Sequence, residues 1–106
     1  MDTGPTPTGA RARVEAVVRG RVQGVGFRFF VERVAAERGL VGWVANEPDG
    51  SVRCVAEGPR DVLEAFLRDL AAGPPAAWVD RVDATWSAAV GGSDRFAIRS
   101  GWHTGD

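Results

Sequence analysis

A glycine-rich loop that ends in an arginine is the part of this sequence that most clearly suggests a binding or catalytic site. Residues 20–28 read Gly-Arg-Val-Gln-Gly-Val-Gly-Phe-Arg, between a strand-like run and a helix-like run. Main-chain N–H groups at such a helix start attract anions, because the helix dipole adds partial positive charge there. Arg28 falls in the first helical turn, where an exposed cation opposes the dipole at a cost of about 0.3–1 kcal/mol. An anion bound between the guanidinium and the amides removes that conflict, so the sequence predicts an anion site.

The anion that fits best is a phosphoryl group held by the amides of residues 22–27. The guanidinium of Arg28 suits a planar two-point contact with two phosphate oxygens. Two common phosphate motifs are excluded. A P-loop needs a lysine, and all 13 basic residues are arginine. The dinucleotide fingerprint needs a third glycine where Phe29 stands.

The remaining residues with reactive side chains include no obvious acid–base pair. The single histidine, His103, lies in a glycine-containing tail and is expected to be a bystander. Cys54 alternates with Val52 in a strand-like run, which predicts a buried structural thiol and allows no internal disulfide. No His, Cys, Asp or Glu cluster has metal-ligand spacing, so we expect no metal.

Such a site suits a mixed carboxylic–phosphoric anhydride. Its leaving group is a carboxylate whose conjugate acid has a pKa of about 4, so it departs unprotonated at neutral pH. The protein then needs only to hold the phosphoryl group and to orient a water molecule. Asn46 is the neutral polar candidate for orienting that water. It equally suits the start of the Glu-Pro-Asp-Gly turn at residues 47–50, and the residues alone leave both interpretations open.

Composition limits the partners. A chain of 106 residues is enough for one domain, and its formal net charge of −1 argues against nucleic acid or an anionic membrane as the main partner. No apolar run is long enough for a membrane span, and the N-terminus lacks the pattern of a signal peptide. The default expectation is a cytoplasmic monomer.

The apolar periodicity predicts a βαββαβ order with a short terminal strand. That order is typical of the ferredoxin-like α+β sandwich, an antiparallel sheet with two helices on one face. A joint site then requires the loop at 20–26 and the end of the second strand to be neighbours. The expected segments are a disordered tail over 1–10, a domain over 11–100 and a tail over 101–106, with strands near 12–19, 40–46, 51–57, 79–87 and 95–99 and helices near 27–38 and 59–72.

Two separated motifs make the chain resemble the acylphosphatase family. The first is the loop at 20–28, and the second is Gly-Leu-Val-Gly-Trp-Val-Ala-Asn at 39–46. The Asp-Gly-Ser-Val turn at 49–52 and the Glu-Gly-Pro exit at 57–59 match as well, so the resemblance covers about residues 12–99.

The resemblance implies the ferredoxin-like fold and cofactor-free hydrolysis of small acyl phosphates to a carboxylate and inorganic phosphate. Phosphate, or sulfate in its place, is then the product or an inhibitor. In this family pattern Arg28 binds the phosphoryl group and Asn46 positions the nucleophilic water. The phosphate cradle corresponds to Arg21, Val22, Gln23, Gly24, Val25, Gly26 and Phe27.

One departure and two alternatives accompany the resemblance. Many family members place an aromatic residue directly after the final Ile-Arg, whereas Ser100 stands there in this chain, which puts the packing of that edge in question. One alternative is a non-catalytic module that binds phosphate or acyl phosphate, like the related domain of hydrogenase-maturation carbamoyltransferases. The other is an RNA-recognition motif, but Phe27 and Phe30 fit a helix stripe rather than a base-stacking strand.

Overall fold

The computed structural model describes residues 10–100 of the chain. The expected tails therefore lie outside the described residues, apart from residue 10 at one boundary, and so does His103. The elements match the predicted ones in number and order, with boundaries shifted by one or two residues. They are β1 (Arg11–Arg21), α1 (Phe27–Glu37), β2 (Val41–Asn46), β3 (Val52–Pro59), α2 (Arg60–Ala72), β4 (Trp78–Ala88) and β5 (Phe96–Ile98).

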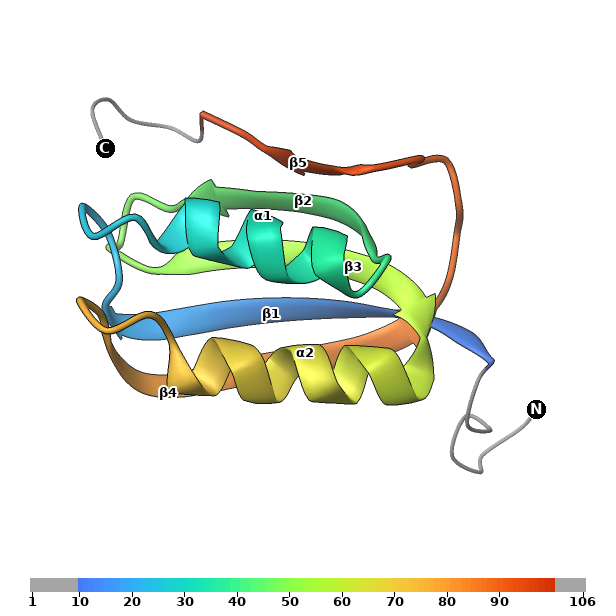
Figure 1. The fold of residues 1–106 in the computed structure, drawn as a ribbon, viewed down its shortest axis with the longest axis horizontal. Coiled ribbons are helices and arrows are strands. Elements are labelled where there is room, and N and C mark those ends of the chain that lie inside the picture. The colour runs from blue at the N-terminus through green and yellow to red at the C-terminus, as the bar shows by residue number, and fades with distance from the viewer. Residues whose placement is uncertain (1–9, 101–106) are drawn as a thin grey trace.

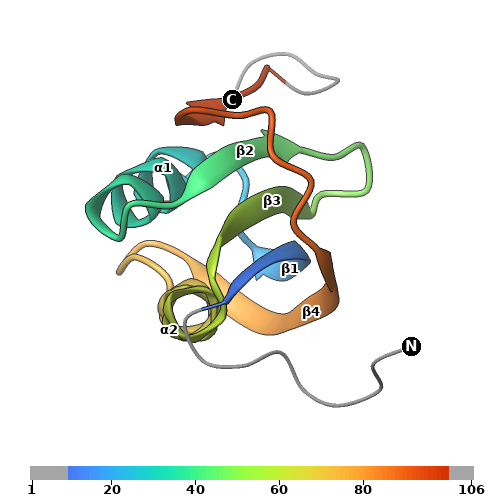
Figure 2. The same cartoon turned by 90° about the vertical axis from the view of Figure 1, so that its right-hand side faces the viewer.

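The strands form one sheet in the order β4-β1-β3-β2-β5, and both helices cover the same face of it (Figures 1 and 2). The ferredoxin-like α+β architecture is thereby confirmed. The sheet is mixed, however, because β5 pairs in parallel with β2 while the other pairs are antiparallel. The chain reverses direction after β4, which itself runs opposite to β2. A strand that follows this reversal must run in the same direction as β2.

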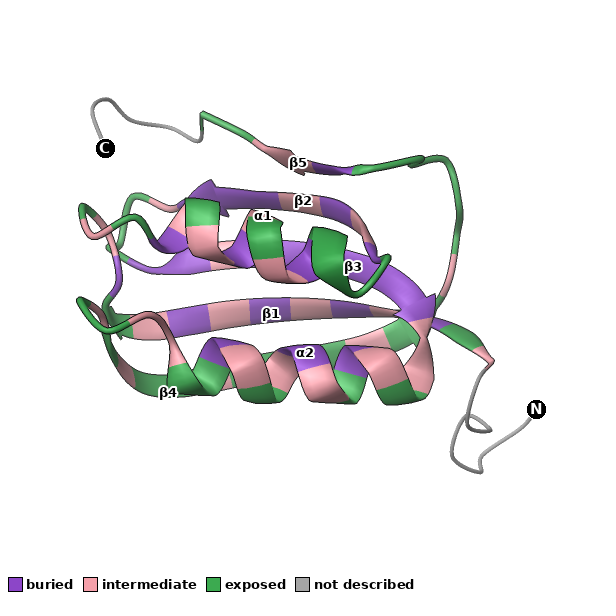
Figure 3. Cartoon of the chain, viewed as in Figure 1, coloured by how far each residue is buried: buried purple, intermediate pink, exposed green. Residues whose placement is uncertain are grey.

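The core lies between the sheet and the two helices (Figure 3). The alternation read from β1 is confirmed, since every second side chain there is buried and faces the helices. The buried side chains that meet in this layer include Ala12, Val14, Ala16 and Val18 from β1, Phe27, Val31 and Ala35 from α1, and Leu63, Phe66 and Leu70 from α2.

The strand register brings the candidate site together. Val52, at the start of β3, pairs with Val18 of β1 on one side and with Asn46 of β2 on the other. Strands β1 and β2 are both antiparallel to β3, so they end at the same edge of the sheet. The loop that leaves β1 therefore starts near the last residue of β2, as a joint site requires.

The helix ends follow their local sequences. Helix α1 stops in a Schellman motif, because the N–H of Leu40 donates to the Ala35 carbonyl and that of Gly39 donates to the Ala36 carbonyl. The expected start of the second helix needs a small correction. Pro59 is the last residue of β3 and the N-cap of α2, with extended backbone angles, so the helix begins at Arg60.

Candidate active site

The glycine-rich loop is fixed at both ends by the core. Val22 and Phe27 are each 1% exposed and belong to the main apolar cluster. Between them, Gly24 and Gly26 have φ angles of 75° and 77°, in the left-handed region that other residues rarely adopt. Gly26 is the N-cap of α1 and supplies no capping side chain, so the first-turn amides are not engaged by one.

A cavity of about 140 Å³ opens at this helix start. The two candidate side chains that the sequence placed in one site, Arg28 and Asn46, both line it, and they come from different elements. The lining residues are Val22, Gly24, Gly26, Phe27, Arg28, Phe29 and Asn46. Three members of the predicted phosphate cradle are not among them: Arg21, Gln23 and Val25.

Arg28 is held from the far end of the chain. Its Nη1 donates a hydrogen bond of 2.6 Å to the main-chain carbonyl of Arg99, just beyond β5. The first turn of α1 carries no acidic residue, whereas the first turn of α2 carries Asp61. Positive charge from the guanidinium and from the helix dipole is therefore concentrated at one helix start, which favours an anion there.

Asn46 is the last residue of β2 and is only 5% exposed. The turn that follows is closed by other groups. Both the N–H and the hydroxyl of Ser51 donate to Asp49, at 2.9 and 2.6 Å, and the N–H of Glu47 donates to the Ser51 carbonyl. The hydroxyl and amide of Ser51 lower the pKa of Asp49 to about 2. Asp49 thus has the turn-forming role that the sequence left open for Asn46.

Gln23 has a role that sequence reasoning missed. Its side-chain nitrogen donates to the carbonyls of Glu47 and Ser51, at 2.8 and 2.9 Å. The side chain therefore ties the glycine-rich loop to the turn that follows Asn46. No spacing rule in a single sequence predicts this contact.

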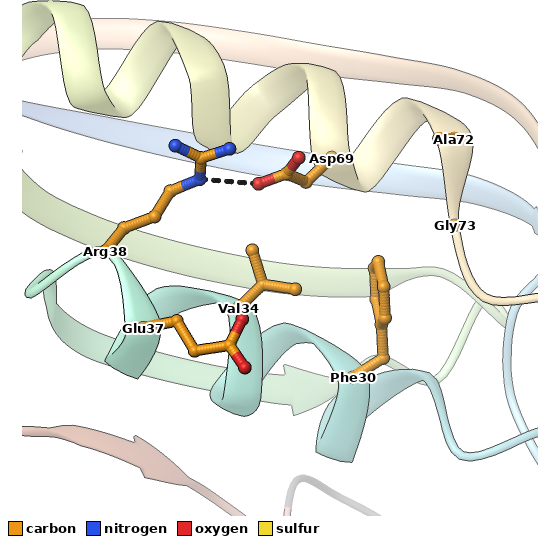
Figure 4. A pocket seen from close by; sticks show the side chains of 7 residues that line it. All are labelled: Phe30, Val34, Glu37, Arg38, Asp69, Ala72 and Gly73. Atoms are coloured by element: carbon orange, nitrogen blue, oxygen red, sulfur yellow. Dashed lines mark hydrogen bonds and ion pairs between the residues drawn. The ribbon is translucent and has the colours of Figure 1, made fainter.

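Three larger cavities lie elsewhere. The smallest of the three, of about 220 Å³, is lined by Trp43, Asp94, Arg95 and Arg99 among others, and the remaining two are larger still. One, of about 580 Å³, is lined by Gly20, Arg21, Trp78 and Asp80. The other, of about 480 Å³, lies between α1 and α2, where Arg38 and Asp69 form an ion pair of 2.6 Å across the groove (Figure 4). None of the three is lined by Arg28 or Asn46. The cavity of about 140 Å³ at the start of α1 therefore has the lining residues expected of an anion site, although it is not the largest cavity.

Other reactive groups do not gather at the site. Cys54 is buried, as predicted, and its burial raises the pKa of the thiol to about 12. Within residues 10–100 there is no group of three or more His, Cys, Asp or Glu side chains placed to hold a metal ion. The helices of the same range are too short or too polar to cross a membrane.

Comparison with known proteins places this arrangement in a family. Residues 14–98 match the family model described as Acylphosphatase, so the chain belongs to the acylphosphatase family. An acylphosphatase from Salinibacter ruber is 49% identical over 92 residues, which are 87% of this chain and 97% of the relative. The crystal structure of acylphosphatase from Bacillus subtilis matches with a TM-score of 0.80 and 42% identity, over 83% of this chain and 98% of that one.

These relatives support a catalytic protein. The chain is an acylphosphatase that acts on acyl phosphates, and the alternative of a non-catalytic module is not supported. The same domain also occurs inside a longer protein. Full-length HypF, in a phosphate- and nucleotide-bound form, matches with a TM-score of 0.79 and 28% identity, over 92% of this chain but only 13% of that one.

Proposed function

We propose that the cavity at the start of α1 is the active site, with Arg28 and Asn46 as its catalytic residues. The observation that carries this assignment is the shared cavity: a guanidinium from α1, a carboxamide from β2 and the glycine-rich main chain line one space. No other cavity described above combines these groups. Arg28 binds two phosphoryl oxygens and the loop amides bind the phosphoryl group as a cradle.

The reaction is an in-line displacement at phosphorus. Asn46 accepts a hydrogen bond from the attacking water through its side-chain oxygen and donates to the phosphoryl group through its nitrogen. The bond from the water oxygen to phosphorus forms while the bond to the acyl oxygen breaks. The leaving carboxylate takes the electron pair and needs no proton at neutral pH. The water protons pass to the phosphoryl oxygens of the substrate, giving inorganic phosphate.

Selectivity for the acyl group is expected to be loose. A cavity of about 140 Å³ has room for the phosphoryl end, and the acyl group then extends past the rim. Phe29 stands at that cavity and is 65% exposed. We therefore propose an enzyme that accepts several acyl phosphates, releases phosphate and is inhibited by it. We further propose that it acts as a monomer in the cytoplasm, with residues 11–100 as its folded domain.

Hydrolysis of benzoyl phosphate in ¹⁸O-labelled water tests the mechanism. Attack at phosphorus predicts one ¹⁸O atom in the released phosphate and none in the benzoate. Turnover should persist in EDTA, and inorganic phosphate should inhibit competitively. Label in the benzoate, or activity abolished by EDTA and restored by a metal ion, would contradict the proposed mechanism.

A further inference from the structure

The carboxamide of Gln23 connects two parts of the proposed active site that are each closed by their own hydrogen bonds. One part is the loop, fixed by the burial of Val22 and by the first bond of α1, in which Phe30 N–H donates to the Gly26 carbonyl. The other is the turn at residues 47–51. It is closed by main-chain hydrogen bonds from Glu47 and Gly50 and by the hydrogen bonds from Ser51 to Asp49. Gln23 donates from the first part to the second.

The two carbonyls that accept from Gln23 already have main-chain partners. Glu47 O also accepts from Gly50 N–H at 3.1 Å, and Ser51 O accepts from Glu47 N–H at 2.9 Å. Loss of the Gln23 side chain thus leaves both carbonyls bonded, and both parts keep their internal structure. What Gln23 adds to the strand register is a direct link between the loop and the turn, and Asn46 directly precedes that turn.

We infer that Gln23 is a positioning residue that sets the distance between the phosphate-binding loop and Asn46. This inference rests on the proposed function of the cavity. It gives Gln23 a different role from a direct phosphate contact: its side chain acts through Asn46 on the attacking water. Displacement of a reacting group by about 1 Å can cost on the order of 10²-fold in rate.

Gln23→Met tests the inference, because methionine keeps the length of the side chain and removes both donors. With benzoyl phosphate, kcat should fall by about 10- to 100-fold. The inhibition constant for inorganic phosphate should stay within about threefold of the wild-type value, because the loop itself is intact. The melting temperature should drop by less than about 10 °C, as expected for the loss of two neutral hydrogen bonds.

A double-mutant cycle with Asn46→Ala shows whether Gln23 acts through Asn46. In the Asn46→Ala background, Gln23→Met should lower kcat by less than about threefold, since the group that it positions is already gone. A further loss as large as in the wild-type background would overturn the inference. So would a folded Gln23→Met variant with wild-type kcat.

Gln23→Glu provides a second test with a pH signature, and it decides the matter if Gln23→Met fails to fold. The carboxylate presents only acceptors to two carbonyls, so kcat at pH 8 should be below that of Gln23→Met. Protonation restores one donor, so kcat relative to wild type should recover as the pH falls from 8 to 5. A ratio that stays constant over this range contradicts the inference.

The two proposals fail in distinguishable ways. If Arg28→Ala and Asn46→Ala both retain wild-type turnover, the assignment of the active site is wrong. If those variants lose activity while both Gln23 variants keep wild-type kcat and a flat pH ratio, only the positioning role is wrong.

Discussion

Arg28 and Arg99 lie 71 positions apart in the chain, and Nη1 of Arg28 donates to the main-chain carbonyl of Arg99 at 2.6 Å. The acceptor is itself fixed to the neighbouring strand, because Arg99 N–H donates to the Val44 carbonyl at 2.8 Å. The Arg99 guanidinium also lies over the Trp43 ring, 4.3 Å from its centroid. The proposed phosphate-binding guanidinium therefore depends on how the end of β5 docks on β2, even though no aromatic residue follows Arg99 directly.

Replacement of Trp43 by alanine should weaken substrate binding through this chain of contacts. A cation–π contact is worth about 0.5–2 kcal/mol, so we expect KM for benzoyl phosphate to rise about two- to thirtyfold. Trp86→Ala is the matched control, since Arg60 covers that ring at 3.6 Å on β4, away from β5. It should lower the melting temperature but leave KM within about twofold. Equal KM changes in the two variants would show a general effect of destabilisation.

Asn46→Ala should separate chemistry from binding. The phosphate cradle of the loop remains, so the inhibition constant for phosphate is expected to change by less than about threefold, while kcat falls by about 10²–10³-fold. Steady-state kinetics with benzoyl phosphate and phosphate inhibition measure both. A variant that loses phosphate binding and keeps kcat would reverse the roles proposed for Asn46 and the loop.

Glu57 gives the fold a defined dependence on acid. It is 4% exposed and accepts hydrogen bonds from Arg13 and from the N–H groups of Val90 and Gly91, each at 2.9 Å. Burial alone raises its pKa, but the amides and the guanidinium outweigh burial and hold the pKa below its ordinary value of 4.5. A carboxyl whose pKa is lowered on folding adds stability above its ordinary pKa, and this stability is lost as the pH falls below that value.

Glu57→Gln should therefore lower the free energy of unfolding by about 1–3 kcal/mol at pH 7. The difference from wild type should shrink at pH 3, because this pH lies below the ordinary pKa of 4.5 and the unfolded wild-type chain then carries the proton. Urea denaturation at both pH values measures this. Glu64→Gln is the control, because Glu64 pairs with Arg60 only at the surface and should cost less than about 1 kcal/mol. A Glu57→Gln effect of equal size at pH 7 and pH 3 would show that the charge of Glu57 does not provide this stability.

Local patterns in the sequence were sufficient for most of the fold. Alternation predicted β1, and the i, i+3, i+4 spacing predicted α1. The sequence only required the loop to lie beside the end of β2 if the two form a joint site, and the structure meets this requirement because β1 and β2 are both antiparallel to β3. The direction and partner of β5 were not predictable, because three residues of strand pattern carry no information about which strand they join. The extra residues of β3 up to Pro59 were missed because proline near a helix start suggests the helix itself.

The side-chain contacts of the site were less accessible to sequence reasoning. Arg28 stands out because a cation in the first turn of a helix opposes the helix dipole. Asn46 stands out because asparagine suits the start of the turn that follows it. Gln23 has no such local feature, and its partners are main-chain carbonyls that no residue type marks. The contact of Arg28 with Arg99 joins opposite ends of the domain through another main-chain carbonyl, so only the tertiary structure reveals it.

Turnover of benzoyl phosphate by Arg28→Ala, compared with Arg33→Ala, decides whether the Arg28 guanidinium binds the phosphoryl group. Both residues lie on α1, but Arg33 is exposed, contacts the Phe30 ring and does not line the cavity. We expect Arg28→Ala to remain folded by circular dichroism and to lose at least about 10²–10³-fold in kcat/KM, with loss of phosphate inhibition. Arg33→Ala should stay within about twofold of wild type. A folded Arg28→Ala protein that hydrolyses benzoyl phosphate as fast as Arg33→Ala would contradict the assignment of this guanidinium to the phosphoryl group.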